Sequence, residues 1–120
     1  MSGVPAAQLT KKRTGPYLIL EVNVTEAEIQ KPVSRLLAVY PDWDGTCMLI
    51  SALDTKPPYR SRGYASSLLS RAIWEARRNG CKFIKLDDCS DAFNDDEHNI
   101  YVKHGFTYDQ AGLPDMRLKL

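Results

Sequence analysis

Two arginines and a glycine lie in a short turn that could bind a phosphate group. The turn reads Arg60-Ser61-Arg62-Gly63-Tyr64-Ala65-Ser66, and it separates an apolar stretch from an amphipathic one. The first N–H groups of a helix attract anions, glycine permits close approach of the backbone, and arginine adds charge-assisted hydrogen bonds. The pattern predicts an anion site at the start of a helix, although a purely structural junction would look the same on these residues alone.

A second group of residues follows further along the chain. Asn94 precedes Tyr101, which opens the run Tyr101-Val102-Lys103-His104-Gly105-Phe106. Taken together, R-x-x-G-x-A and N-x6-Y-x3-G-F resemble the motifs of the GNAT family of N-acetyltransferases, and Pro57-Pro58-Tyr59-Arg60 resembles the lead-in to the family's turn. The resemblance covers roughly residues 47–120, and it is weak before them.

The resemblance implies a fold, a cosubstrate and a set of contacts. The fold would be α+β (mixed α/β), with a mostly antiparallel central sheet, two parallel strands splayed around a coenzyme A cleft, and flanking helices. Acetyl-CoA would be the acetyl donor, with its diphosphate in the turn and its pantetheine arm along the strand end. The implied contacts are Leu53, Asp54, Thr55, Arg60, Ser61, Arg62, Gly63, Tyr64, Ala65, Ser66, Asn94 and Tyr101.

Acetyl transfer also needs groups that move protons. A phenol with a pKa near 10 suits protonation of a departing thiolate, so Tyr101 is the candidate general acid. The stretch Cys47–Ala52, where some family members place a glutamate, contains no carboxylate. Candidates for the base are therefore Asp54 and Asp88, with Asp87 and Glu21 as alternatives, and the sequence does not choose among them.

An acidic run suggests the kind of acceptor. The residues between positions 87 and 97 include six acids and no lysine or arginine: Asp87, Asp88, Asp91, Asp95, Asp96 and Glu97. A solvated loop explains them simply, but an acidic lip would attract a cationic amine such as a protein lysine or N-terminus, or a polyamine. His98 and His104 are expected to be surface residues without a catalytic role.

The chain is short for the family, because the usual first strand and helix pair are compressed or missing. Either the acceptor side is open, or a second subunit completes it in a homodimer. Two other functions remain as alternatives: a catalytically silent CoA-binding regulatory module, and an unrelated α+β interaction domain.

The pattern of apolar residues predicts the elements that position these groups. We expect a flexible tail over residues 1–16 and one domain over 17–120. The chain is predicted to form strands over 17–24, 33–40, 46–54, 82–86 and 116–120. Thr25–Glu28 resembles a capping box, so a short helix or turn could follow and would end at Pro32. Residues 41–45 would make a hairpin turn, and helices are expected over 65–79, closed by Gly80, and about 95–104. Trp74 is expected to be a packing residue or an interface anchor.

Composition limits the partners. The 16 lysines and arginines nearly balance the 15 acids, so a formal charge of +1 gives no global attraction to nucleic acid or anionic membrane. No apolar run approaches the ~20 residues of a membrane span. The three cysteines, Cys47, Cys81 and Cys89, lack C-x-x-C spacing, which argues against a disulfide framework and a zinc site. We expect no metal, and a reducing, cytoplasmic setting.

Overall fold

A single mixed sheet organises the part of the chain that the computed structural model describes, residues 7–41, 46–87, 100–109 and 115–120. Its strand order is β1-β2-β3-β4-β5-β7-β6. The elements are β1 (Ala7–Thr14), β2 (Tyr17–Glu26), β3 (Ile29–Val39), β4 (Cys47–Thr55), the 3-10 turn η1 (Pro57–Tyr59), α1 (Tyr64–Arg78), β5 (Phe83–Asp87), α2 (Ile100–Lys103), β6 (Thr107–Tyr108) and β7 (Asp115–Lys119). The predicted mixed, mostly antiparallel α+β architecture is confirmed.

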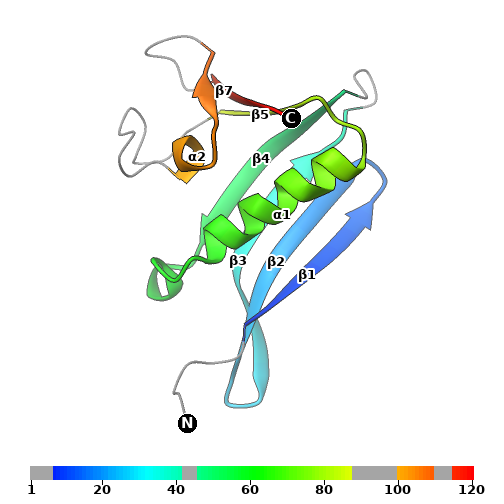
Figure 1. Cartoon of the computed structure of the whole chain (residues 1–120). Helices are drawn as coiled ribbons and strands as arrows, with labels where there is room; N and C mark the ends of the chain where they lie inside the picture. The colour runs from blue at the N-terminus through cyan, green and yellow to red at the C-terminus, as the bar shows by residue number, and fades with distance from the viewer. Residues whose placement is uncertain (1–6, 42–45, 88–99, 110–114) are drawn as a thin grey trace.

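The strands β1 to β4 form an antiparallel meander, and β5 then pairs parallel to β4. A parallel pair needs a crossover connection, which α1 supplies, as the strand–helix–strand pattern predicts. The strand β7 inserts between β5 and β6, antiparallel to both. Figure 1 shows α1 across one face of β1 to β4, with α2 beside the β5–β7 end of the sheet.

The core lies between α1 and the sheet. Leu18, Leu20, Val22 and Val24 alternate along β2 and are buried on the side that α1 covers. From α1, the residues at helical spacing contribute the other half of the core: Leu68, Leu69, Ala72, Ile73 and Ala76. Gly80, at φ +79°, ends the helix as predicted, and the N–H groups of Gly80 and Cys81 close it by donating to the carbonyls of Arg77 and Ala76. Cys47 and Cys81 are also buried.

The N-terminal residues differ from the prediction of a tail over 1–16. Residues Ala7–Thr14 form β1, which pairs along its whole length with β2 from Ala7↔Val24 to Thr14↔Tyr17. All but one of its side chains are exposed, because an edge strand has only one partner strand and little apolar cover. A polar strand of this kind is held by its backbone hydrogen bonds, which leave no apolar pattern in the sequence.

The predicted helix or turn after Thr25 is also different. Ala27 and Glu28 take positive φ values of 50° and 65° and form the tight turn of the β2–β3 hairpin. A two-residue turn with both central residues at positive φ has a backbone twist that matches the twist of the two strands it joins. Pro32 lies inside β3 beside a bulge, where Val22 pairs with Ser34 and Asn23 with Pro32. Proline lacks a backbone N–H, and a strand tolerates that at a bulge.

The other elements agree with the prediction where they are described. The β3–β4 hairpin, α1, β5 and the terminal strand β7 lie within one or two residues of their predicted limits, except that β3 starts earlier. The short strand β6 has no counterpart in the prediction. Of the helix predicted over 95–104, Ile100–Lys103 is helical, and residues 95–99 lie outside the described part. Within the described ranges, none of the helices has the length and apolarity to cross a membrane.

Candidate functional site

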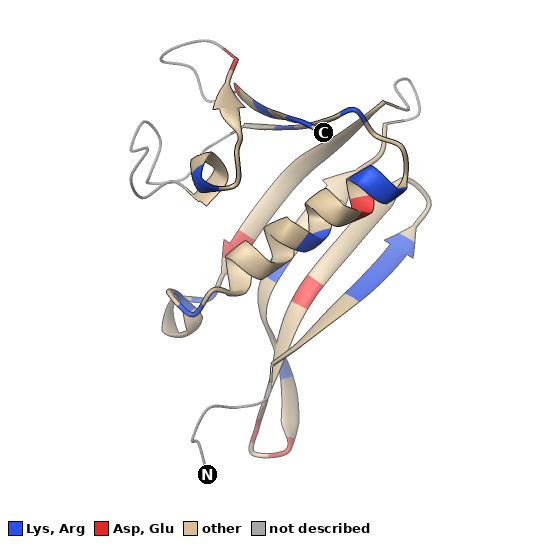
Figure 2. Cartoon of the chain, in the orientation of Figure 1, with Lys and Arg blue, Asp and Glu red and all other residues tan. Residues whose placement is uncertain are grey.

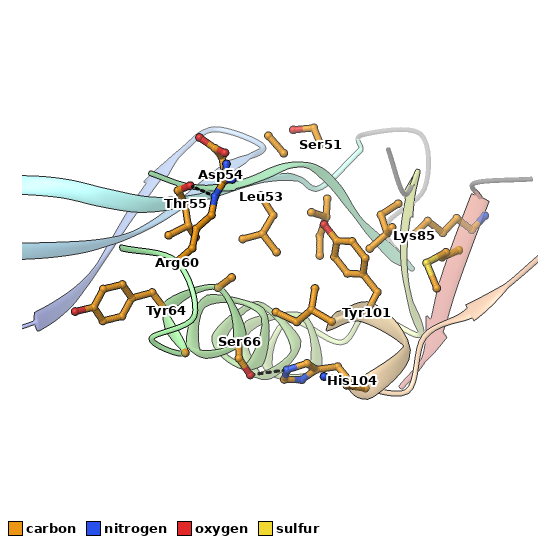
Figure 3. Close-up of a pocket in the computed structure, with 18 of the residues that line it drawn as sticks. Ser51, Leu53, Asp54, Thr55, Arg60, Tyr64, Ser66, Lys85, Tyr101 and His104 are labelled. Atoms are coloured by element: carbon orange, nitrogen blue, oxygen red, sulfur yellow. Dashed lines mark hydrogen bonds between the residues drawn. The ribbon is translucent and has the colours of Figure 1, made fainter. Parts of the chain in front are cut away.

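A cleft of about 1420 Å³ opens where β4 and β5 separate. The two strands pair only from Cys47↔Phe83 to Ile50↔Leu86, although β4 continues to Thr55. Beyond Ile50, the described residues provide no partner strand on this side of β4. The cleft is lined by the end of β4, the turn before α1, the first residues of α1, and residues of α2, β5 and β7 (Figure 3).

The open edge of β4 contains a bulge at Ser51. Leu37 pairs with Ala52 and Ala38 with Ile50, so Ser51 has no opposite residue, and its hydroxyl donates to the carbonyl of Leu37 at 3.3 Å. A bulge redirects backbone groups and commonly marks a functional site. The unpaired edge from Ser51 to Thr55 can therefore offer backbone donors and acceptors to an extended ligand, as the sequence predicts for Leu53, Asp54 and Thr55.

The predicted anion site is built as a helix start without a cap. Gly63 is the N-cap residue of α1 at φ +83° and makes no side-chain capping hydrogen bond. The first helical hydrogen bond runs from the Ser67 N–H to the Gly63 carbonyl at 3.0 Å. The N–H groups of Tyr64, Ala65 and Ser66 come before it and therefore have no acceptor within the helix. A Cβ on Gly63 would meet nothing within 4 Å. An anion can approach these N–H groups directly, where the helix dipole favours negative charge.

The arginines of the turn have different positions. Arg60 lines the cleft and donates from Nε to the carbonyl of Thr55 at 3.1 Å, which leaves its terminal nitrogens for a ligand. Arg62 is outside the cleft lining and stacks over the Tyr59 ring, 5.2 Å from the ring centroid. The Tyr59 hydroxyl in turn donates to the Glu26 carboxylate, and this hydrogen bond holds the pKa of Glu26 below its ordinary value. The β2–β3 hairpin thus supports the turn from behind.

Tyr101 reaches into the cleft from α2, toward β4 (Figure 3). The side chain is 9% exposed and packs edge-to-face on Phe106, with ring centroids 5.9 Å apart. The backbone supports this pair, because the Phe106 N–H donates to the Tyr101 carbonyl at 3.0 Å. The Y-x3-G-F pattern therefore has a structural reason: Gly105, at φ +95°, turns the chain so that Phe106 returns to hold the Tyr101 ring.

His104 has a position that sequence reasoning missed. It was expected on the surface, but it lines the cleft half-buried, and its Nε2 lies 2.8 Å from the Ser66 hydroxyl. Burial lowers its pKa below the ordinary value of 6.5. The spacing of three from Tyr101 could have indicated this, because residues i and i+3 share a helix face. The contact joins α2 to the start of α1 across the cleft.

The His104 contact leads to a pH-dependent prediction. Because the folded protein lowers the pKa of His104, the unfolded chain binds the proton more tightly. The contribution of His104 to the free energy of unfolding should therefore be complete above about pH 6.5, the ordinary pKa. It should be lost as the pH falls from there through the lowered pKa of the folded protein. In His104→Gln, which keeps a nitrogen near the Nε2 position, this part of the pH dependence should disappear. Thermal unfolding of both proteins between about pH 7.5 and 5.5 checks it, and parallel curves would contradict it.

The candidate bases differ in where they lie, and only some of them are in the described part of the chain. Asp54 pairs with Arg35, which pairs with Glu21, so the three side chains share the sheet face opposite α1. Figure 3 shows Asp54 on the far side of β4 from Tyr101. Arg35 Nε lies 3.9 Å from Glu21, so this trio holds two carboxylates and one cation, while the neighbouring strands β1, β5 and β7 place Lys12, Lys85 and Arg117 on the same face. Asp88 and Asn94 lie outside the described residues, as do the acids at 91, 95, 96 and 97 and the side chain of Asp87.

Comparisons with known proteins agree with this geometry. The sequence model of the Acetyltransferase (GNAT) family matches residues 8–106. A comparison with curated protein sequences finds no match. Among solved structures, the chain is similar to a GNAT family acetyltransferase from Elizabethkingia anophelis with acetyl-CoA bound, at 12% identity and a TM-score of 0.70 over 95% of this chain and 98% of that one.

Two further structures resemble the chain. The PaiA N-acetyltransferase from Thermoplasma acidophilum, in complex with coenzyme A, has 16% identity and a TM-score of 0.67 over 88% of this chain. The Arabidopsis thaliana NAA60 in complex with a bisubstrate analogue has 12% identity and a TM-score of 0.65 over 87% of this chain and 74% of that one. The chain spans only 62% of the Thermoplasma protein's length.

Proposed function

Since the chain belongs to the GNAT family of acetyltransferases, we propose that it transfers the acetyl group of acetyl-CoA directly to a primary amine. The observation that carries the proposal is the cleft between β4 and β5, with an uncapped helix start at one end and Tyr101 reaching into it. The helix start suits a diphosphate, the region of Tyr101 suits a thioester, and the cleft between them suits the extended arm that joins the two.

The residues of the cleft fit coenzyme A chemically. The N–H groups at the start of α1 and the free guanidinium nitrogens of Arg60 would hold the diphosphate. Space for it exists because nothing lies within 4 Å of a Cβ placed on Gly63. The open β4 edge from Ser51 to Thr55 would hydrogen-bond the pantetheine amides like an added strand. Neighbouring structures that contain CoA or acetyl-CoA support the choice of cosubstrate.

The bound donor would supply an activated acyl carbon, and the chain's own groups would handle charge and protons. A backbone N–H at the β4 bulge can donate to the carbonyl oxygen as negative charge develops on it. Tyr101 would donate its hydroxyl proton to the departing sulfur. The two described cysteines, Cys47 and Cys81, are buried outside the cleft lining and Cys89 lies outside the described residues, so direct transfer is proposed from the cleft without a described thiol in it.

The acceptor would approach from the sheet face opposite α1. There Glu21 and Asp54 flank Arg35, and we take these two neighbouring carboxylates as the local feature that favours a cationic amine, such as a protein lysine, a protein N-terminus or a polyamine. Of the two described candidates, Asp54 and Glu21, Asp54 also lines the cleft, so it would remove the amine proton, directly or through water. β1 leads into β2 through a short turn, and in the described part of the chain no helix lies over this face. The face would therefore accommodate a bulky acceptor or a second copy of the chain. The buried thiols suit a reducing, cytoplasmic location.

Calorimetric titration of acetyl-CoA into the protein, followed by an acceptor panel, tests the proposal. We expect one-to-one binding, and faster thiol release with lysine peptides, free peptide N-termini and polyamines than with neutral or anionic amines. Binding without turnover on any acceptor would favour a silent CoA-binding module. No binding at millimolar acetyl-CoA would contradict the cosubstrate itself and favour an interaction domain.

A further inference from the structure

Positive charge gathers on one surface of this nearly neutral chain, away from the cleft. Figure 2 shows lysine and arginine on β1 and at the C-terminal end of α1. We define the basic surface by its cations and one aromatic residue: Lys11, Arg13, Arg71, Arg77, Arg78 and Trp74. The only acid of α1 is Glu75, which is 3% exposed and bridges Lys11 Nζ at 3.2 Å and Arg71 Nε at 3.1 Å. Its charge is covered by its partners, so the exposed side of the surface is cationic among the residues that the structure describes.

The two elements of the basic surface are in contact. Lys11 pairs with Leu20 and Arg13 with Leu18, and both leucines are buried on the α1 side of the sheet. Lys11 and Arg13 therefore share the face of the sheet that carries α1, and the Lys11–Glu75 ion pair joins the two elements. A small pocket of about 210 Å³ lies between them, lined by Lys11, Arg13, Leu18, Glu75, Arg78 and Asn79. It shares no lining residue with the cleft.

Trp74 is the unusual residue of this surface. It is 47% exposed, and two guanidinium groups stack over its ring, that of Arg71 at 4.6 Å and that of Arg78 at 5.1 Å from the centroid. Stacking on an indole holds the plane of an arginine against the ring, and Arg71 Nε is held in addition by Glu75. Arg13 is held similarly, 4.2 Å over the Tyr40 ring, whose hydroxyl accepts a hydrogen bond from Asn79. Three of the five cations are thus ordered before any partner binds.

Simpler roles explain part of this arrangement. Lysine and arginine on an edge strand discourage pairing with other chains, and cations in the last turn of a helix complement its dipole. Neither role requires a half-exposed tryptophan between two arginines, nor cations ordered on aromatic rings around a pocket. Phosphodiesters match ordered guanidinium groups, and unpaired bases offer flat rings that stack on exposed aromatic and guanidinium planes.

We propose that the basic surface binds single-stranded nucleic acid, with phosphates on Lys11, Arg13, Arg77 and Arg78 and a base on the Trp74–arginine stack. The net charge of +1 gave no reason to expect such a partner. That argument concerns the average over the chain, whereas binding depends on the local concentration of cations. The proposal does not depend on acetyl transfer, because the two sites share no residue.

Fluorescence anisotropy of a labelled oligouridylate of about 15 nucleotides, a length that single-strand sites accommodate, tests it. We expect binding that weakens steeply between about 50 and 200 mM salt. The double variant Arg77→Gln/Arg78→Gln should weaken binding roughly tenfold and reduce the log–log salt slope by about 1.4, for two lost phosphate contacts. The matched control Lys31→Gln/Lys119→Gln removes the same charge from exposed positions elsewhere and should bind like the wild type.

A tryptophan variant and two further ligands identify the kind of partner. Trp74→Leu should lower affinity for the oligonucleotide while leaving the salt slope unchanged, because it removes a ring and no charge. Circular dichroism and acetyl-CoA titration of each variant verify that it is folded. The proposal is wrong if the wild type does not bind at low salt, if both double variants lose affinity equally, or if a duplex of the same length binds as tightly. Tighter binding of polyglutamate than of the oligonucleotide would also overturn it, in favour of an acidic protein partner.

Discussion

Tyr101→Phe should lower kcat by about 10²- to 10⁴-fold, the usual contribution of a general acid, while the Kd for acetyl-CoA stays near the wild-type value. The substitution removes only the hydroxyl, and the edge-to-face contact with Phe106 remains because the ring remains. Without the phenolic proton, the thiolate must leave with its charge uncompensated or take a proton from water. Steady-state kinetics with a saturating acceptor, together with calorimetric titration of acetyl-CoA, measure the two quantities separately.

The control for this substitution is Tyr108→Phe, which removes a hydroxyl from β6 outside the cleft lining. It should leave kcat unchanged. If Tyr101→Phe lost less than about threefold in kcat, a change small beside the usual contribution of a general acid, the proton would come from elsewhere and Tyr101 would be a packing residue. If it lost cofactor affinity instead, the hydroxyl would be a binding group.

Gly63→Asp should weaken acetyl-CoA binding by about 100-fold or more, because it places a carboxylate beside the proposed diphosphate site. The side chain has room, since nothing lies within 4 Å of a Cβ at this position. Aspartate adopts the left-handed backbone of Gly63, at φ +83°, more readily than most side chains, although with some strain. Most of the loss should therefore come from charge repulsion, and that part should shrink as salt is raised.

Gly63→Asn provides the matched comparison, because asparagine has the same shape and a similar tolerance of positive φ but carries no charge. Its Kd for acetyl-CoA should lie between those of the wild type and Gly63→Asp. Equal losses in the two variants would show that steric exclusion, not charge, controls the turn. Wild-type affinity in both would place the diphosphate somewhere else.

Much of the fold followed from apolar periodicity, and the misses have physical causes. The α1 stripe and the buried strand before it were visible because core residues repeat at the spacing of their element. β1 was missed because backbone pairing, not burial, holds its polar residues on the sheet edge. The turn at Ala27 and Glu28 was missed because these residue types rarely adopt positive φ. The long β2–β3 ladder imposes that conformation, and no local pattern reports it.

The site was predictable where a motif fixes backbone geometry. Gly63 at a helix start and Gly105 before Phe106 both have the positive φ that their positions in the motifs require. The Ser51 bulge left no sequence signal, since it depends on how β3 and β4 align. The Ser66–His104 contact depends on how α1 and α2 pack, although the spacing from Tyr101 indicates the face. The side of the sheet on which Asp54 lies followed only from strand register.

The strand order has a consequence for the sequence of events during folding. β1 to β4 are joined to their neighbours by short turns, so their contacts close small loops and can form early. β5 pairs with two strands: β4, which precedes it in the chain, and β7, which follows it. During synthesis from the N-terminus, the meander and α1 can therefore assemble while β5 still lacks one neighbour. Because the cleft is lined by β4 and also by Met116 of β7, it is completed only when β7 has docked. The growing chain thus acquires its meander before it acquires the pocket.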